Sequence, residues 1–364
     1  MRNFLTLSLA LLLAVPVFGQ RSKKSTESMP VQLSEGITYS LPRTAIRVKV
    51  TATRTDFIPG PYALYAETLL GIQNVKNQAR MVWSIDGIEF STFGVADPEQ
   101  RFRTGSLSTP ILPLTADGCL AGFNTTATPA VSPEAPVTNF YAPPASPVMP
   151  AFTRLTNSND LTGRAPVEQR AAAAAATIMK ARTARMDIVT GMFDEFHPDG
   201  DAYEESLNEL RKVEKTNLEL FTGKSSSSLH TFVYDFTPSS TGARGEVIFR
   251  FDEALGFLPK SDFSGKPVLI DVELTAAANG AAAGTAATSG GPATLDAPAT
   301  GLFYRQPAWA DVRLSQELTI IATTRLPLAQ MGSVIPVPAE LLTGTYAIEF
   351  HPVTGAITTV TRKQ

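Results

Sequence analysis

Few side chains in this chain of 364 residues are suited to acid–base or nucleophilic chemistry. The imidazole bases are His197, His230 and His351, and no Gly-x-Ser-x-Gly motif places a serine in a sharp strand-to-helix turn. His351 precedes a proline in an expected hairpin turn, and His230 begins an expected strand. The pattern therefore favours turn and surface roles for these histidines over a catalytic triad.

The densest group of potential metal ligands lies between residues 194 and 205. It contains Asp194, Glu195, His197, Asp199, Asp201, Glu204 and Glu205. Oxygen ligands at this density could hold Ca²⁺, but the ordered alternation and distal bidentate glutamate of a calcium loop are missing. A turn followed by a helix cap at Asp201 already explains Pro198-Asp199-Gly200-Asp201, and a zinc site with one histidine is favoured less.

Phosphate-binding and thiol chemistry are also disfavoured. Thr222-Gly223-Lys224-Ser225 is similar to the end of a phosphate-binding loop, but Leu218 stands where that loop needs glycine, so a helix C-terminus at Gly223 is favoured. Cys119 is the single cysteine, which excludes an internal disulfide. No histidine lies beside it in the sequence to stabilise a thiolate, so a structural role is favoured.

The carboxylates and tryptophans do not define a site. With 34 acidic residues, the sequence offers too many pairs to select one for glycoside hydrolysis. Trp83 and Trp309 fall in strand-like segments, which predicts core or sheet-surface positions rather than sugar platforms. We therefore assign no catalytic, cofactor-binding or metal-binding residue and predict no cofactor.

Composition limits the partners. The chain has 43% apolar and 18% charged residues, enough for a sizeable core, and a formal net charge of -3 from 31 basic and 34 acidic side chains. There is no excess of Lys or Arg to displace counterions from nucleic acid, so nucleic-acid binding is not expected.

The N-terminus predicts export. Arg2, an apolar run from Phe4 to Phe18 and the small residue Gly19 are typical of a secretory signal peptide over residues 1–19, cleaved between Gly19 and Gln20. The expected location is periplasmic or extracellular. No later apolar run approaches membrane-spanning length, so no transmembrane segment is expected after cleavage.

Hydrophobic periodicity predicts a first β-unit over residues 37–160, after a flexible lead over 20–36. Ile46, Val48, Val50 and Ala52 alternate with polar residues as in a half-buried strand. A short helix from Pro61 to Gly71 follows, with Tyr62, Tyr65 and Leu69 on one face, and then a strand pattern over 81–93 that turns at Asp86-Gly87. The proline-rich stretch 110–150 predicts a surface excursion.

Residues 161–223 predict an antiparallel hairpin of two long helices. The first runs from Pro166 to Thr190 through six consecutive alanines and ends at Gly191; the second opens at Asp201 and ends at Gly223. Alternating apolar residues then predict a second β-unit over 224–364, with an Ala/Gly-rich mobile loop at 279–301. The fold class expected is α+β: two antiparallel β-units, sandwich-like or partly closed, with the helical hairpin between them.

Several phrases resemble an uncharacterised family of exported bacterial proteins, the domain-of-unknown-function 4831 family. They are Tyr39–Thr44, Pro59–Ala63, Leu70–Gly71, Leu220–Gly223, Leu326–Gly332 and Phe350–Ala356. None is a catalytic signature, so the resemblance implies export and a shared fold without an activity. The stretches at 110–150 and 280–300 are longer than the family pattern requires.

These observations favour a non-catalytic exported envelope protein that binds or braces a protein or glycan partner. The helical hairpin offers such a partner a surface that catalysis does not need. Two alternatives stay open: a periplasmic hydrolase that uses carboxylates or a metal, and a calcium-stabilised adhesion module. Oligomeric state and strand order are not predicted.

Overall fold

The computed structural model describes residues 36–104, 111–126, 152, 165–191, 200–275 and 299–363. The signal peptide and most of the lead before residue 37, residues 127–151 of the proline-rich stretch, and residues 276–298 lie outside the described residues, as does His197. The described part is β-rich, with three sheets and few helices.

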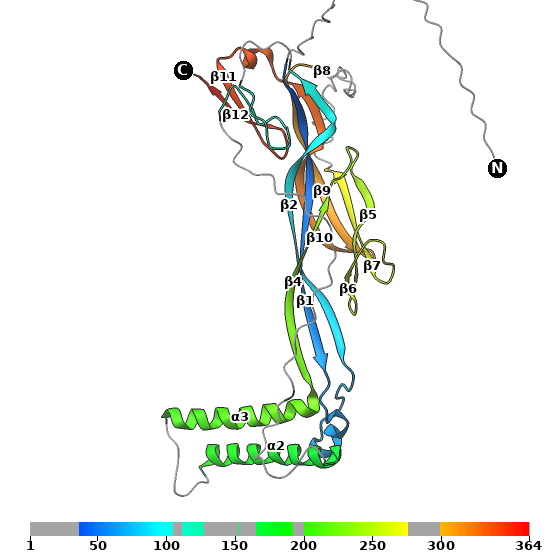
Figure 1. Ribbon diagram of the computed structural model, residues 1–364, viewed down its shortest axis with the longest axis vertical. Helices are drawn as coiled ribbons and strands as arrows, with labels where there is room; N and C mark the ends of the chain where they lie inside the picture. The colour runs from blue at the N-terminus through cyan, green and yellow to red at the C-terminus, as the bar shows by residue number, and fades with distance from the viewer. Residues whose placement is uncertain are drawn as a thin grey trace, which may run out of the picture. The chain divides into compact units, whose positions relative to one another are not determined.

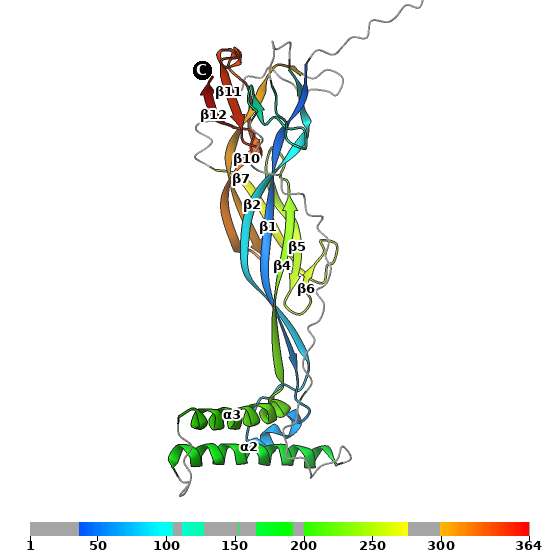
Figure 2. The ribbon, with the colours of Figure 1, turned by 60° about the vertical axis from the view of Figure 1, so that its left-hand side comes forward.

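The first sheet is built on two long antiparallel strands, β1 (Thr38–Ile58) and β2 (Arg80–Arg103). The strand order is β4-β1-β2-β8, with β4 (Lys224–Phe236) antiparallel to β1 and the short β8 (Ala299–Thr300) parallel to β2. Figures 1 and 2 both show β4, β1 and β2 side by side. The predicted alternation in β1 is confirmed: its four apolar residues from Ile46 to Ala52 are fully buried.

The second and third sheets use residues from the C-terminal half. The second has the order β10-β9-β7-β5-β6, and the third has the order β12-β11-β3. The strands are β3 (Gly122–Phe123), β5 (Ala243–Asp252), β6 (Gly256–Leu258), β7 (Lys266–Leu274), β9 (Phe303–Gln316), β10 (Thr319–Pro336), β11 (Tyr346–Phe350) and β12 (Ile357–Arg362). The main core lies between the first two sheets, where Val48 and Val50 join the cluster that contains Phe249, Ile270 and Val312.

Strands that precede the helices in the sequence pair with strands that follow them, so the strands do not form two separate groups. β4 follows the helices in sequence yet pairs with β1 from Ile46↔Phe236 to Ile58↔Lys224, and β3 from the N-terminal half pairs with β11. Apolar periodicity reports which face of a strand is buried but not which strand lies beside it. The expected N-terminal and C-terminal groupings therefore do not describe the observed pairing.

Three local predictions were wrong. β2 continues through Asp86-Gly87, where Thr51 pairs with Gly87 and Ala52 with Ile85, so Asp86 forms a bulge and not a turn. The stretch from residue 110 is not wholly a surface excursion, since Leu120 and Phe123 are buried. The predicted loop at 279–301 ends in the short strand β8.

The helices follow the sequence signals closely. A 3-10 turn, η1 (Ala63–Tyr65), leads into α1 (Ala66–Leu70), and Gly71 ends it in the left-handed conformation. α2 (Val167–Thr190) ends at Gly191, and α3 (Gly200–Thr222) ends at Gly223. Asp201 lies inside the first turn of α3 and not before it. In the first turn its carboxylate still interacts favourably with the helix dipole.

α2 and α3 contact each other (Figure 1). Ala174 and Ile178 of α2 share a buried cluster with Leu220 and Phe221 of α3. Further along α2, Arg182 and Arg185 both bind Glu214, at 2.7 and 2.6 Å. Among the described residues, no helix is both long and apolar enough to cross a membrane. A final 3-10 turn, η3 (Ala339–Leu342), precedes β11.

Candidate functional site

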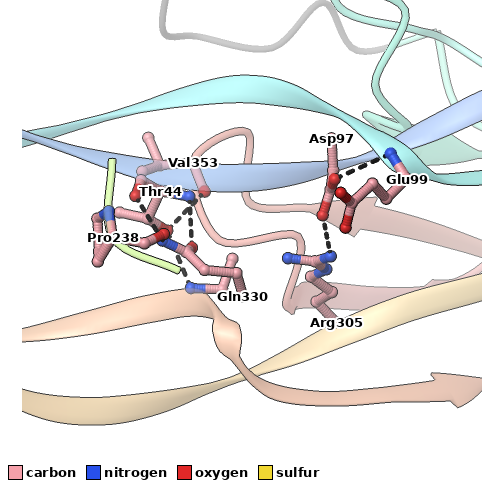
Figure 3. Close-up of polar contacts among 8 residues, drawn as sticks. Thr44, Asp97, Glu99, Pro238, Arg305, Gln330 and Val353 are labelled. Atoms are coloured by element: carbon pink, nitrogen blue, oxygen red, sulfur yellow. Dashed lines mark hydrogen bonds and ion pairs between the residues drawn. The ribbon is translucent and has the colours of Figure 1, made fainter. Parts of the chain in front are cut away.

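Three phrases that carried the family resemblance meet in the fold. They are Tyr39–Thr44 on β1, Leu326–Gly332 on β10, and Phe350–Ala356 at the turn between β11 and β12. Here the side chains of Thr44, Asp97, Arg305 and Gln330 are all buried (Figure 3). We call these four residues the polar junction. Its hydrogen bonds and its ion pair link strands of the first two sheets and the β11–β12 turn of the third.

Gln330 forms the first half of the polar junction. Its Oε1 accepts the backbone N–H of Thr44 at 2.9 Å, and its Nε2 donates to the carbonyl oxygens of Thr44 (3.0 Å) and Pro238 (3.2 Å). The hydroxyl of Thr44 donates to the carbonyl of Val353 and accepts the N–H of Ala329. The amide of Gln330, on β10, thus bonds both to β1 and to Pro238 in the segment after β4. The hydroxyl of Thr44, on β1, bonds both to β10 and to the β11–β12 turn.

An ion pair forms the second half. Arg305 Nη2 on β9 donates to Asp97 Oδ2 on β2 at 2.5 Å, and both side chains are at least 94% buried. Asp97 lies opposite Leu41, where four residues of β2 face one residue of β1, and its Oδ1 accepts the N–H of Glu99. Burial lowers the pKa of Arg305 by disfavouring its charged form, and the charge of Asp97 opposes that shift.

The β11–β12 turn closes over this region. His351 accepts backbone N–H groups of Val353 and Thr354 on Nδ1, and its carbonyl accepts the N–H of Gly355. The turn lies so close to β2 that a Cβ on Gly94 would be 2.4 Å from the carbonyl oxygen of Pro352. The predicted turn role of His351 agrees with this geometry.

The polar junction has the chemistry of a structural clasp. The two polar ends of the Gln330 amide are hydrogen-bonded, and Thr44 is bonded through its hydroxyl and its backbone. Within the described residues, no group of three or more His, Cys, Asp or Glu side chains is arranged to hold a metal ion. What the site does is fix the register of three sheets against one another.

We expect Gln330→Leu to lower the free energy of unfolding by about 2 kcal/mol, because the buried N–H and carbonyl of Thr44 and the carbonyl of Pro238 lose their partner. Urea unfolding of the purified variant measures this. The matched control is Gln306→Leu, on an exposed position of β9, which should leave the midpoint almost unchanged. Equal midpoints for both variants would contradict the clasp.

Cys119 lies beside the polar junction and is buried. Desolvation raises the pKa of its thiol to about 11, and its backbone bridges to Ser40 of β1. We expect iodoacetamide to label the folded protein far more slowly at pH 8 than the urea-unfolded chain, because the thiolate is scarce and covered. Comparable labelling rates, read by mass spectrometry, would refute this placement.

The other candidate residues from the sequence are dispersed. His230 lies in the middle of β4, where Nε2 is 2.8 Å from the hydroxyl of Ser228 and the ring packs against Trp83. Trp83 is buried, whereas Trp309 is half exposed on the sheet surface. Gly223 ends α3 with a positive φ, and its N–H donates to the carbonyl of Glu219, as in a helix cap.

Sequence reasoning did not single out Asp97, Arg305 or Gln330. The available signal was a polar residue inside an apolar strand phrase, as Gln330 stands in Leu-Pro-Leu-Ala-Gln-Met-Gly. The bonded residues are remote in the sequence: Thr44 is 286 residues from Gln330, and Asp97 is 208 residues from Arg305. Pairing at such separations depends on strand order, which local patterns do not encode.

The described residues thus define a β-rich protein with several antiparallel sheets fastened at a buried polar junction. The chain belongs to the family described as Domain of unknown function (DUF4831), whose model matches residues 35–358. This match confirms the resemblance seen in the sequence. No curated protein and no solved structure gave a significant match.

Proposed function

We propose that this protein is a non-catalytic exported envelope protein that binds or braces a protein or glycan partner. In this proposal the leader over residues 1–19 directs the chain to a periplasmic or extracellular compartment. α2 and α3 act together as one antiparallel helical hairpin, and the sheets form the rigid body that carries it.

The observation that carries the proposal is that the buried polar side chains are bonded to the backbone or to one another. Thr44 and Gln330 are bonded to backbone groups, Asp97 is bonded to Arg305, and His351 is bonded to its own turn. A hydrolase needs a base and a nucleophile aimed at a shared open position. Polar groups engaged in holding strands together are instead what a bracing protein needs.

The helical hairpin is supported by the order of its contacts. The start of α2 clusters with the end of α3, and Arg182 and Arg185 near the end of α2 bind Glu214, earlier in α3. Contacts that run in opposite directions along two helices are those of an antiparallel pair. Two adjacent helices of 24 and 23 residues offer a partner a surface roughly 35 Å long.

Capture from envelope extract tests the proposal. The immobilised full chain should recover a specific envelope protein or glycan, and glycan and peptide substrates incubated with it should stay intact. Turnover of a substrate with no recovered partner would favour the carboxylate- or metal-dependent hydrolase. A melting temperature that falls on adding a chelator would favour the calcium-stabilised adhesion module, because binding only to the native state raises the midpoint.

A further inference from the structure

The outward faces of α2 and α3 differ in chemistry. The exposed side of α3 is charged, as expected for a surface in water; it carries Glu204, Glu205, Glu209, Arg211, Lys212 and Lys215. The exposed side of α2 carries an uncharged row of residues instead. This row consists of Ala172, Ala176, Met179, Thr183, Met186 and Thr190, and we call it the α2 seam.

The spacing of the α2 seam is that of a coiled coil. Its members are separated by four, three, four, three and four residues, which is the a and d pattern of heptads. The two methionines, the largest side chains of the seam, are 45% and 62% exposed. The buried face of α2 is a different one and includes Ala171, Ala174, Ile178 and Ala181, of which the first three share a cluster with α3. α2 thus presents one packed face and a second heptad face without a helix on it in the described structure.

The charges beside the α2 seam identify its occupant. Lys180 and Asp187 each follow a seam methionine by one residue, so they form a column of opposite charges one heptad apart. Arg182 and Arg185, the other basic residues nearby, are held by Glu214. Two copies of α2 related by a two-fold axis run antiparallel, and such a pair places Lys180 of each copy next to Asp187 of the other.

We propose that the α2 seam binds a second copy of this chain, and that the two α2 helices form an antiparallel coiled coil. The seam residues interdigitate, with Met179 facing Thr183 and Met186 facing Ala176 across the interface. The small residues let the helices approach, and the methionines fill the space between them. This association goes beyond the proposed function, since it concerns two copies of the chain and holds whether or not another envelope component binds.

Charge variants of the full chain test this directly by sedimentation equilibrium. The unchanged protein should dimerise with rising concentration, and Lys180→Asp or Asp187→Lys alone should weaken the dimer at least tenfold, because like charges then meet twice. Mixing these two variants should restore association as a mixed dimer, detected by energy transfer between differently labelled chains. The matched control is Lys215→Asp on the outer face of α3, which should dimerise normally.

Other outcomes overturn the proposal. A protein that stays monomeric over the whole concentration range would exclude a second copy as the occupant and leave the seam to another partner or to a segment of the same chain. A dimer that is unaffected by Lys180→Asp and by Met186→Glu would place the interface elsewhere. Circular dichroism of each variant shows whether the helices are retained, so loss of folding is separated from loss of association.

Discussion

Asp97→Ala should lower the free energy of unfolding by about 3–5 kcal/mol, the largest loss expected from any side-chain truncation in the polar junction. The variant leaves the guanidinium of Arg305, whose side chain is only 5% exposed, without its counterion. Arg305 is also held in a region that disfavours its charge, since burial already lowers its pKa. Urea denaturation followed by far-UV circular dichroism measures the change.

Two comparisons isolate the buried pair. Glu89→Ala breaks the exposed pair with Lys49 and should leave stability almost unchanged, because exposed ion pairs contribute little. The double variant Asp97→Leu with Arg305→Met removes both charges and should be more stable than Asp97→Ala alone. If the double variant loses as much free energy of unfolding as the separate removals of Asp97 and of Arg305 added together, the two groups do not act as a pair. The ion pair is then not the source of the loss.

Gly332→Ala should cost about 3 kcal/mol or prevent folding, because the added methyl group has no space. A Cβ on Gly332 would lie 1.8 Å from the carbonyl oxygen of Gln306 and 2.9 Å from the backbone nitrogen of Ala308. Both obstructing atoms belong to the backbone of β9, which a rotamer change cannot move. The glycine lies within the register shift of β10 between Leu328 and Ser333, the same irregular stretch that contains Gln330 of the polar junction.

Gly87→Ala is the matched control for this substitution. Gly87 also lies in a long strand, and a Cβ there would meet nothing within 4 Å. Thermal melting should therefore separate the two variants clearly, with Gly87→Ala close to the unchanged protein. Similar melting temperatures for both variants would mean that β9 and β10 are not as close at Gly332 as the structure has them.

Much of the secondary structure could be predicted because its signals are local. Alternation identified the buried face of β1, and glycines at 71, 191 and 223 marked helix ends that the structure confirms. The continuation of β2 past Asp86-Gly87 could not be predicted, because the same dipeptide suits a turn and a bulge. The pairing of β2 with its neighbour β1 decides between a turn and a bulge, and the residues of β1 are remote in the sequence.

The polar junction was beyond prediction for a related reason. Asp97 is one of 34 acidic residues, and nothing in its neighbourhood marks it as the partner of Arg305. Its burial follows from the arrangement of β2 opposite Leu41 and from the β11–β12 turn packed nearby. The α2 seam, by contrast, could have been predicted from the sequence, since a heptad pattern is local.

The unbroken length of β1 has a mechanical consequence. At about 3.4 Å per residue, its 21 residues extend roughly 70 Å. Its antiparallel hydrogen bonds to β2 and β4 lie perpendicular to that direction. A force that pulls β1 and β2 in opposite directions along their length therefore loads many of these bonds at once, in shear, and cannot open them one after another. Tension applied along this strand should meet much greater resistance than the same tension applied across it.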